Sequence, residues 1–174
     1  MGFILAQIFG GIALIIVCIG YFLKNKSSFM IMQIIANLFY SSAFFVVGSY
    51  VGGGIVTISI FRCLYLYIAE KKSFKYTLHF LPIFIILYTI TTIAFWNSPY
   101  DFMPLITSTM FTLGLSIKNL QTMRYILIIP NSILVIYNIL TTTYASAILD
   151  FIEIIVIIIS IINFHKKTTK NALE

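Results

Sequence analysis

The sequence predicts an all-α polytopic membrane protein, and composition is the first reason. Hydrophobic residues make up 60% of the 174 residues, charged residues make up 9%, and the mean hydropathy is +1.04. A soluble domain typically has about 45–50% apolar and roughly 25% charged residues. The second reason is that the Ile-, Leu- and Phe-rich runs lack strict alternation of apolar and polar residues. Because lipid offers the backbone no hydrogen bonds, such runs favour helices over a β-barrel.

Seven apolar segments each approach the ~17–25 residues that a helix needs to cross a bilayer. In chain order they cover residues 3–23, 30–50, 54–69, 78–96, 102–117, 124–143 and 146–164. Short breaks separate them at residues 24–28, 52–54, 70–75, 97–101, 118–121 and 143–145. No break is long enough to hold a soluble domain. We therefore expect one membrane domain over residues 1–174 with seven crossings.

The third and fifth segments are the weakest of the seven. Segment 54–69 contains Arg62, and segment 102–117 is short and carries several Ser and Thr residues behind Pro104. Six crossings is therefore the alternative count. The charges favour seven, because cations follow every odd-numbered segment and no Lys or Arg follows an even-numbered one. These cations are Lys24 and Lys26, then Lys71, Lys72 and Lys75, then Lys118 and Arg124, and finally Lys166, Lys167 and Lys170.

The alternation of charge also predicts an orientation. By the positive-inside rule, the N-terminus lies outside and the C-terminus in the cytoplasm. The net charge of +6 then reflects topology and attraction to anionic membrane lipid, and we expect no nucleic-acid partner. The first segment has neither a basic region before it nor a small-residue cleavage motif after it, so we expect it to remain as a helix. Cys18 and Cys63 lack ligand spacing, and we expect no metal site and no cofactor.

An internal repeat appears when the chain is shifted by 94 positions along itself. The shift aligns Gly20 with Gly114, Lys24 with Lys118, Asn25 with Asn119, Ile34-Ile35 with Ile128-Ile129, Asn37 with Asn131, Ser49-Tyr50 with Thr143-Tyr144, and Lys72 with Lys166. One extra helix separates the copies, so both copies run in the same direction. We predict two parallel three-helix bundles, residues 1–72 and 102–167, a linker helix at 78–96 and a short cytoplasmic tail at 168–174. Repeat-built membrane folds commonly bind solutes between their halves.

Arg62 and Glu153 are opposite charges inside apolar segments, and such charges mark functional sites by default. At ~1.5 Å per residue the two reach comparable depth from the outer side, so we expect them to meet. Asp150 lies one helical turn before Glu153. One interpretation is a wet cavity in which Arg62 binds a polar or anionic solute and Glu153, with Asp150, couples transport to protons. The other interpretation is a buried ion pair that only fixes helix register.

Three asparagines are further candidates for contacting a solute: Asn37, Asn131 and Asn138. Asn37 and Asn131 occupy equivalent repeat positions, and Pro130 frees a backbone carbonyl in the turn before it. Their alternative role is hydrogen bonding between helices, worth roughly 1 kcal/mol per bond. Candidate conformational hinges are Pro104, Pro130, Gly10 and Gly11.

The sequence resembles the YgjV family of bacterial inner-membrane proteins along nearly its whole length. The resemblance is carried by Ala6-Gln7, Gly11-Ile12-Ala13, Phe44, Gly48-Ser49-Tyr50, Arg62, Pro104-Leu105, Leu120, Met123-Arg124, Asn138, Glu153 and Asn163. That family is similar to the SWEET and PQ-loop transporters, which implies a three-plus-one-plus-three arrangement and solute transport. The chain departs from these relatives in having no Pro-Gln dipeptide, and from YgjV-type chains in having Leu134 and Val135 where a tryptophan is expected.

We expect no enzyme, because the sequence lacks the HExxH, GxSxG and Gly-rich phosphate-loop motifs, and His79 has no acidic or cysteine partner nearby. The function predicted is a carrier of a small polar solute that works by alternating access in the inner membrane. The alternative is a non-transporting accessory or receptor-like membrane protein whose polar residues serve only helix packing. Expected partners are the solute and membrane lipid, and a homo-oligomer is left open.

Overall fold

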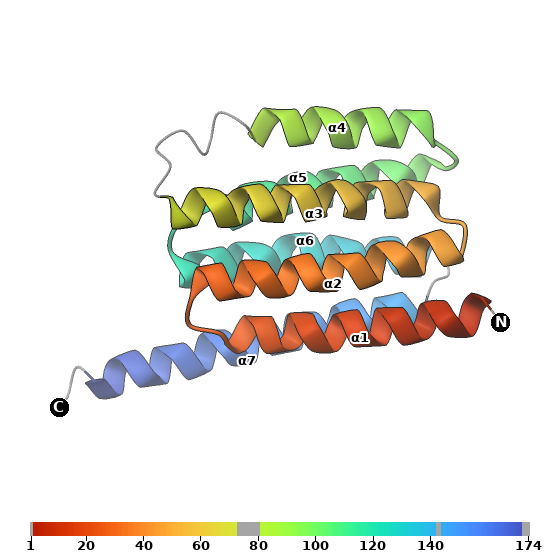
Figure 1. The fold of residues 1–174 in the computed structure, drawn as a ribbon. Coiled ribbons are helices and arrows are strands. Elements are labelled where there is room, and N and C mark those ends of the chain that lie inside the picture. Colours follow the sequence, from red (N-terminus) through yellow and green to blue (C-terminus); the bar gives the residue numbers. More distant parts are fainter. Residues whose placement is uncertain (1, 73–80, 142–143, 172–174) are drawn as a thin grey trace.

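The computed structural model describes residues 2–72, 81–141 and 144–171, and in these ranges the chain is helical (Figure 1). The elements are α1 (Gly2–Phe22), α2 (Lys26–Val46), α3 (Tyr50–Lys71), α4 (Leu81–Ala94), the 3₁₀ turn η2 (Pro99–Asp101), α5 (Phe102–Ser116), α6 (Leu120–Leu140) and α7 (Tyr144–Asn171). One α-helix corresponds to each predicted segment, so the all-α prediction is confirmed for the described residues. Five of these helices, α1, α2, α3, α6 and α7, are long and apolar enough to cross a membrane.

Helix α3 begins earlier than predicted, and the predicted break at residues 52–54 is wrong. The chain instead reverses at Gly48, whose φ of 77° lies in the left-handed region. Gly48 N–H donates to Phe45 O and Ser49 N–H donates to Phe44 O, which satisfies carbonyls at the end of α2. The weak third segment is thereby extended into a helix of 22 residues, long enough to span a bilayer.

The glycines of residues 52–54 serve close packing. A Cβ on Gly54 would lie 2.7 Å from Thr91 Cγ2 of α4, and a Cβ on Gly52 would lie 2.9 Å from the Phe44 ring of α2. Real Cβ atoms do not approach other atoms this closely. The glycine run therefore allows α3 to lie directly against helices on both of its sides.

Helices α2 and α6 each begin at an asparagine cap, and the 94-residue shift aligns the two caps, Asn25 and Asn119. Asn25 Oδ1 accepts the N–H of Ser27 at 3.0 Å, and Asn119 Oδ1 accepts the N–H of Gln121 at 2.9 Å. Each cap satisfies a free N–H at the start of its helix. Helix α6 consequently begins at Leu120, four residues before the predicted start, and Arg124 lies inside it.

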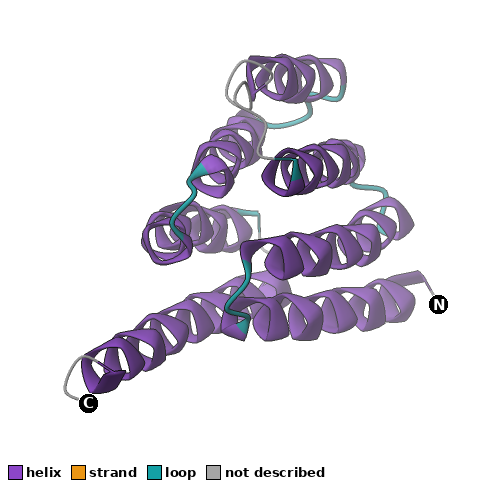
Figure 2. Cartoon of the chain, turned by 60° about the vertical axis from the view of Figure 1, so that its left-hand side comes forward, coloured by secondary structure: helices purple, strands orange, loops and turns teal. Residues whose placement is uncertain are grey.

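Six helices form a closed ring, and α4 lies outside it. Consecutive helices run antiparallel, and the described ends of the chain lie at opposite ends of the stack (Figures 1 and 2). The main contacts join α1 to α2, α2 to α3, α3 to α5, α5 to α6, α6 to α7 and α7 to α1. Helix α4 packs against α3 and α5. In this order α3 and α7 stand on opposite sides of the ring.

The outer surface of the whole helix bundle, α4 included, is apolar, as expected for a surface that faces lipid. In α4, for example, Ile83, Ile86, Ile90 and Ile93 form an exposed stripe at the spacing of one helix face. Buried apolar residues gather instead inside the ring, near the end where α1 finishes and α2 begins: Tyr21, Phe29, Met30, Leu115, Met123, Leu127 and Ile157. The interior is therefore densely filled at this end.

We predict that Gly54→Ala destabilises the protein while Gly11→Ala does not. The methyl group at position 54 would meet Thr91, whose rotamer is fixed by a hydrogen bond from its Oγ1 to Leu87 O. Overpacking of this kind costs about 1–3 kcal/mol. At position 11 a Cβ meets nothing within 4 Å, so Ala should gain roughly 0.5–1 kcal/mol of helix propensity.

The measurement is the thermal unfolding midpoint of the purified protein in one detergent. Gly54→Ala should lower the midpoint by several degrees relative to Gly11→Ala, since about 1 kcal/mol corresponds to roughly 2–4 °C in a chain of this size. Equal midpoints for the two variants would contradict the close packing of α3 on α4.

Candidate solute-binding cavity

A cavity of about 240 Å³ lies inside the ring, and all six ring helices contribute to its wall. Every residue predicted to bind a solute or to carry protons lines it: Arg62, Glu153, Asn37, Asn131, Asn138 and Asp150. The predicted hinge residues Gly10 and Pro104 also line it, whereas Gly11 and Pro130 do not. The structure thus brings together polar residues that are far apart in the sequence, and their roles in binding remain predictions.

The cavity occupies only one end of the ring. Its wall comes mainly from the first halves of α1, α3, α5 and α7 and from the second halves of α2 and α6. Because neighbouring helices are antiparallel, all these halves lie at the end of the stack where the N-terminus lies (Figure 1). The buried apolar cluster fills the other end. We call these the cavity end and the closed end.

Arg62 lies in the cavity wall with its side chain 3% exposed. Its Nη1 donates to Ser108 O at 3.3 Å and to Thr112 Oγ1 at 3.1 Å, both in α5. Its Nη2 donates to Cys63 Sγ at 3.6 Å, and the hydroxyl of Tyr88 in α4 is a further neighbour. Its Nε has no hydrogen-bond partner. The guanidinium is therefore held against α5 by neutral groups.

Glu153 lies in the wall formed by α7 and is 7% exposed. Its Oε1 accepts the hydroxyl of Tyr21, from α1, at 2.8 Å. Asp150 Oδ2, one turn away, accepts Asn138 Nδ2 of α6 at 2.6 Å. The two carboxylates are thus positioned by neutral donors from the helices on either side of α7.

The predicted contact between Arg62 and Glu153 is wrong. Both residues are described by the structure, and they form no ion pair with each other, whereas Lys26 pairs with Glu70 at 3.3 Å between Nζ and Oε2. The physical reason is the order of helices in the ring. Helix α3 contacts α2, α4 and α5, whereas α7 contacts α1 and α6. The ring order therefore places the two charges on opposite walls, and each binds partners from the helices beside it.

The asparagines have different partners inside the cavity wall. Asn37 Nδ2 donates to Cys63 Sγ at 3.8 Å, so Cys63 accepts from both α2 and α3. Asn131 Nδ2 donates to Leu127 O at 2.9 Å within its own helix, and the side chain also neighbours Glu153 and Tyr21. No pattern in the sequence indicates that Cys63 Sγ contacts both Arg62 and Asn37.

Pro104 lies at the start of a helix, where a proline does not interrupt the helical hydrogen bonds. It is the third residue of α5, in the first turn, where a missing N–H removes no helical hydrogen bond. Pro130 lies inside α6, which continues from Leu120 to Leu140. Its missing N–H leaves the carbonyl of Ile126 without its usual helical donor. Of the two prolines, only Pro130 weakens a helix interior.

Arg124 fastens the closed end, a role that the sequence did not reveal. The side chain is fully buried, and its Nη2 donates to the carbonyls of Tyr21 at 2.7 Å and Leu23 at 2.8 Å. Its guanidinium also lies 4.1 Å from the ring centroid of Phe164 in α7. A cation at the C-terminal carbonyls of a helix is favourable. Arg124 thus joins α6 to α1 and α7.

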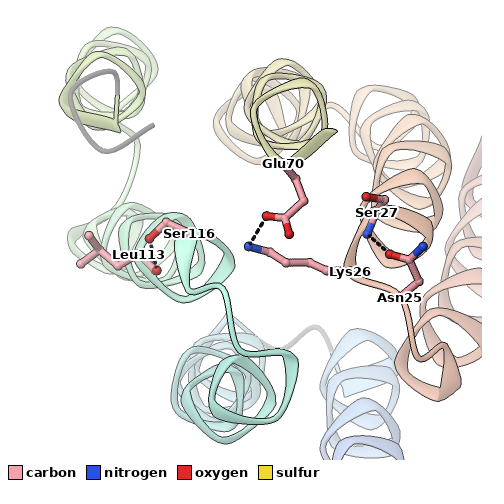
Figure 3. A network of polar contacts seen from close by, with 6 residues as sticks. All are labelled: Asn25, Lys26, Ser27, Glu70, Leu113 and Ser116. Carbon is pink, nitrogen blue, oxygen red and sulfur yellow. Dashed lines mark hydrogen bonds and ion pairs between the residues drawn. The ribbon is translucent and has the colours of Figure 1, made fainter. Parts of the chain in front are cut away.

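The ion pair of Lys26 and Glu70 lies at the same end. Lys26 reaches from the start of α2 toward Glu70 at the end of α3, with Ser116 of α5 in the same view (Figure 3). The Lys26 side chain is 8% exposed, so its charge is largely removed from solvent. Polar contacts therefore link α2 to α3 and α6 to α1 at the end where the cavity is absent.

Residues 4–168 match the profile of the Imp-YgjV family, which is described as bacterial inner membrane protein. This match covers nearly the whole chain and confirms the predicted resemblance to the YgjV family. No curated protein matches the chain, and no solved structure matches it.

We predict that Tyr21→Phe destabilises the protein, because it removes the hydroxyl that donates to the buried Glu153 carboxylate. A hydrogen bond to a charged group contributes about 1.5–3 kcal/mol. The matched control is Tyr125→Phe, in which the same atom is removed from a side chain that is 53% exposed.

Thermal unfolding of both variants in one detergent is the measurement. Tyr21→Phe should unfold several degrees below the unsubstituted protein. Tyr125→Phe should unfold at the same temperature as the unsubstituted protein. A Tyr21→Phe midpoint equal to that of the control would show that the hydroxyl does not support the carboxylate.

Proposed function

Because the chain belongs to the Imp-YgjV family of bacterial inner membrane proteins, we propose that it is a carrier that moves a small polar solute by alternating access. The observation that carries this proposal is the one-ended cavity with buried Arg62 and Glu153 in its wall. A protein whose polar residues served only packing would gain stability by filling such a space, since cavities are destabilising. Solute sites within the membrane are commonly built from such interior polar groups.

Two half-bundles, α1–α3 and α5–α7, are the moving parts in this proposal. Several contacts support the repeat. The 94-residue shift makes α1 equivalent to α5 and α3 equivalent to α7. The contact of α3 with α5 is therefore equivalent to that of α7 with α1, and both contacts are present. A Cβ on Gly20 would lie 3.2 Å from Met32 Cβ, and a Cβ on Gly114 would lie 3.3 Å from Ile126 Cγ2, the residue equivalent to Met32. This supports the proposed three-plus-one-plus-three arrangement and the kinship with SWEET-type transporters, with α4 as linker.

In this proposal, the described state is the one that a solute enters from the cavity end. Five cations lie at or beside helix ends at the closed end: Lys24, Lys26, Lys71, Lys72 and Lys118. By the positive-inside rule the closed end faces the cytoplasm and the N-terminus lies outside. Alternating access then requires Arg124 to release the end of α1, and the cavity end to close. Pro130, inside α6, and Gly10, in the cavity wall, are the proposed points of bending.

Glu153 and Asp150 are the proposed proton carriers. The titratable groups near them are Cys18 and Tyr21 of α1 and Tyr40 of α2, with Arg62 on the wall opposite. Each carboxylate can take up a proton from the cavity and give it up after the closed end opens. Such carboxylates are the usual proton relays of membrane carriers.

We predict that Arg62→Ala and Glu153→Gln each abolish flux while the protein still inserts. The control for loss of a cation is Lys71→Ala, because Lys71 is exposed at the end of α3 and does not line the cavity. Proteoliposomes containing each variant would be given a mixture of amino acids, sugars, nucleosides and carboxylic acids, with and without a proton gradient. Uptake of each compound would be measured by mass spectrometry.

The unsubstituted protein and Lys71→Ala should accumulate the same compound, and both cavity variants should fall to the level of empty vesicles. Normal uptake by both cavity variants would refute the assigned site. Uptake of no compound by the unsubstituted protein would favour the accessory function.

We also predict that Arg124→Gln makes the closed end accessible from the cytoplasm. The reporter is Leu66→Cys in a chain whose native cysteines are replaced by Ala, because Leu66 is 3% exposed and belongs to the buried cluster of the closed end. Labelling by a membrane-impermeant maleimide in inside-out vesicles should become several-fold faster with Arg124→Gln.

The charge-matched control is Lys118→Gln, which removes an exposed cation near the same end. Its labelling rate should equal that of the reporter alone. If Arg124→Gln inserts normally and labels no faster than this control, the Arg124 contacts do not hold the closed end shut.

A further inference from the structure

The cavity carries opposite charges on opposite walls. Arg62 lies on α3, and Glu153 and Asp150 lie on α7. These helices do not neighbour one another in the ring, because α5 and α2 flank the first and α1 and α6 flank the second. The space between the walls is the cavity itself. A molecule inside it therefore has a cationic group on one side and acidic groups on the other.

Among the residues that the structure describes, no opposite charge forms an ion pair with Arg62, Glu153 or Asp150. The groups bonded to Arg62 are a carbonyl, a hydroxyl and a thiol, and its buried Nε has no partner. Glu153 is bonded to a phenol, and Asp150 is bonded to an amide. Buried charges are stable when an opposite charge is near, and hydrogen bonds from neutral groups replace lost hydration only in part. Neither wall has a counter-charge among the described residues, and a ligand with both charges could supply one to each wall.

We propose that the solute is a small zwitterion of the amino-acid type, with its carboxylate on Arg62 and its ammonium group on the side of Glu153 and Asp150. This inference rests on the proposed carrier function and names the substrate class of the same site. A guanidinium suits a carboxylate because its planar donors match two oxygens. A carboxylate pair suits an ammonium group, which has three donors and no acceptor.

The rest of the wall fits the same class of ligand. The amide of Asn37 lies in the wall with Arg62, and those of Asn131 and Asn138 lie in the wall beside the acidic groups. Apolar side chains fill the remainder of the wall, among them Ile55, Phe111, Leu134 and Leu149. An apolar side chain of moderate size can contact these residues while both charged groups are bound. Sugars offer no charge to either wall.

A ligand with a single charge is expected to bind more weakly. An anion would satisfy Arg62 and add a negative charge near two carboxylates. A cation would satisfy the carboxylates and leave Arg62 buried without a counter-charge. Discrimination against both follows from the charges that remain unpaired, as is general for buried polar sites.

The test is binding to the purified protein in nanodiscs, measured by isothermal titration calorimetry. The probes are glycine, alanine, valine and leucine, together with N-acetylglycine, which keeps only the negative charge, and glycine methyl ester, which keeps only the positive charge. Both capped probes are smaller than leucine, so size does not explain their failure. At least one of the free amino acids should bind at least tenfold more tightly than both capped probes.

Two variants assign the charges to the walls. Arg62→Gln should abolish the preference for the free amino acid over glycine methyl ester. The double variant Asp150→Asn with Glu153→Gln should abolish the preference over N-acetylglycine, and Lys118→Gln should change neither. Retention of both preferences in the two cavity variants would overturn the assignment.

Two outcomes overturn the zwitterion inference: no free amino acid binds, or a capped probe binds as tightly as the best of them. The carrier function is tested separately by the uptake mixture. If that mixture yields uptake of a sugar or a nucleoside and of no amino acid, the carrier stands and the zwitterion falls. If it yields no uptake of any class, the carrier function itself fails.

Discussion

The separation of Arg62 from Glu153 is the constraint on which the cavity depends. If α3 and α7 were neighbours, the two side chains would pair, and the pair would fill the centre of the ring. The observed order places α5 beside α3 and α1 beside α7. Ser108 and Thr112 then hold the guanidinium, and Tyr21 holds the carboxylate. Among the described residues, each charge is therefore bonded by neutral groups from the helices beside it.

The difference between the two ends of the ring follows from which polar groups each end contains. At the closed end, Arg124 satisfies carbonyls at the end of α1, where a helix leaves acceptors without partners. Apolar side chains fill the space around it. At the cavity end the charged groups belong to side chains that line the cavity. One end is therefore closed by contacts within the protein, whereas the other holds a cavity with charged side chains in its wall.

The sequence predicts the position of a residue along its helix better than it predicts which residues of other helices it contacts. Hydropathy and charge alternation predict where the helices lie. The rarity of charge inside apolar segments singles out Arg62 and Glu153. These predictions need only the position of a residue along its own helix. Whether two residues of equal depth touch depends on ring order, which is a tertiary property. The same holds for Arg124, whose position after a short break looked like an orientation signal. The misplaced break at residues 52–54 has another cause, since glycines allow both turns and close helix packing.

Tyr21 connects the cavity to the closed end. Its hydroxyl donates to Glu153 in the cavity, and its carbonyl accepts from Arg124 and Ser160 at the closed end. A solute or proton that draws the Glu153 carboxylate away from this hydroxyl changes the forces on the last turn of α1. That turn is the part of α1 to which Arg124 is fastened. Coupling needs an element with two arrangements that both sites influence. The end of α1 meets this requirement in the proposed cycle, because one residue there bonds to the site and to the closure.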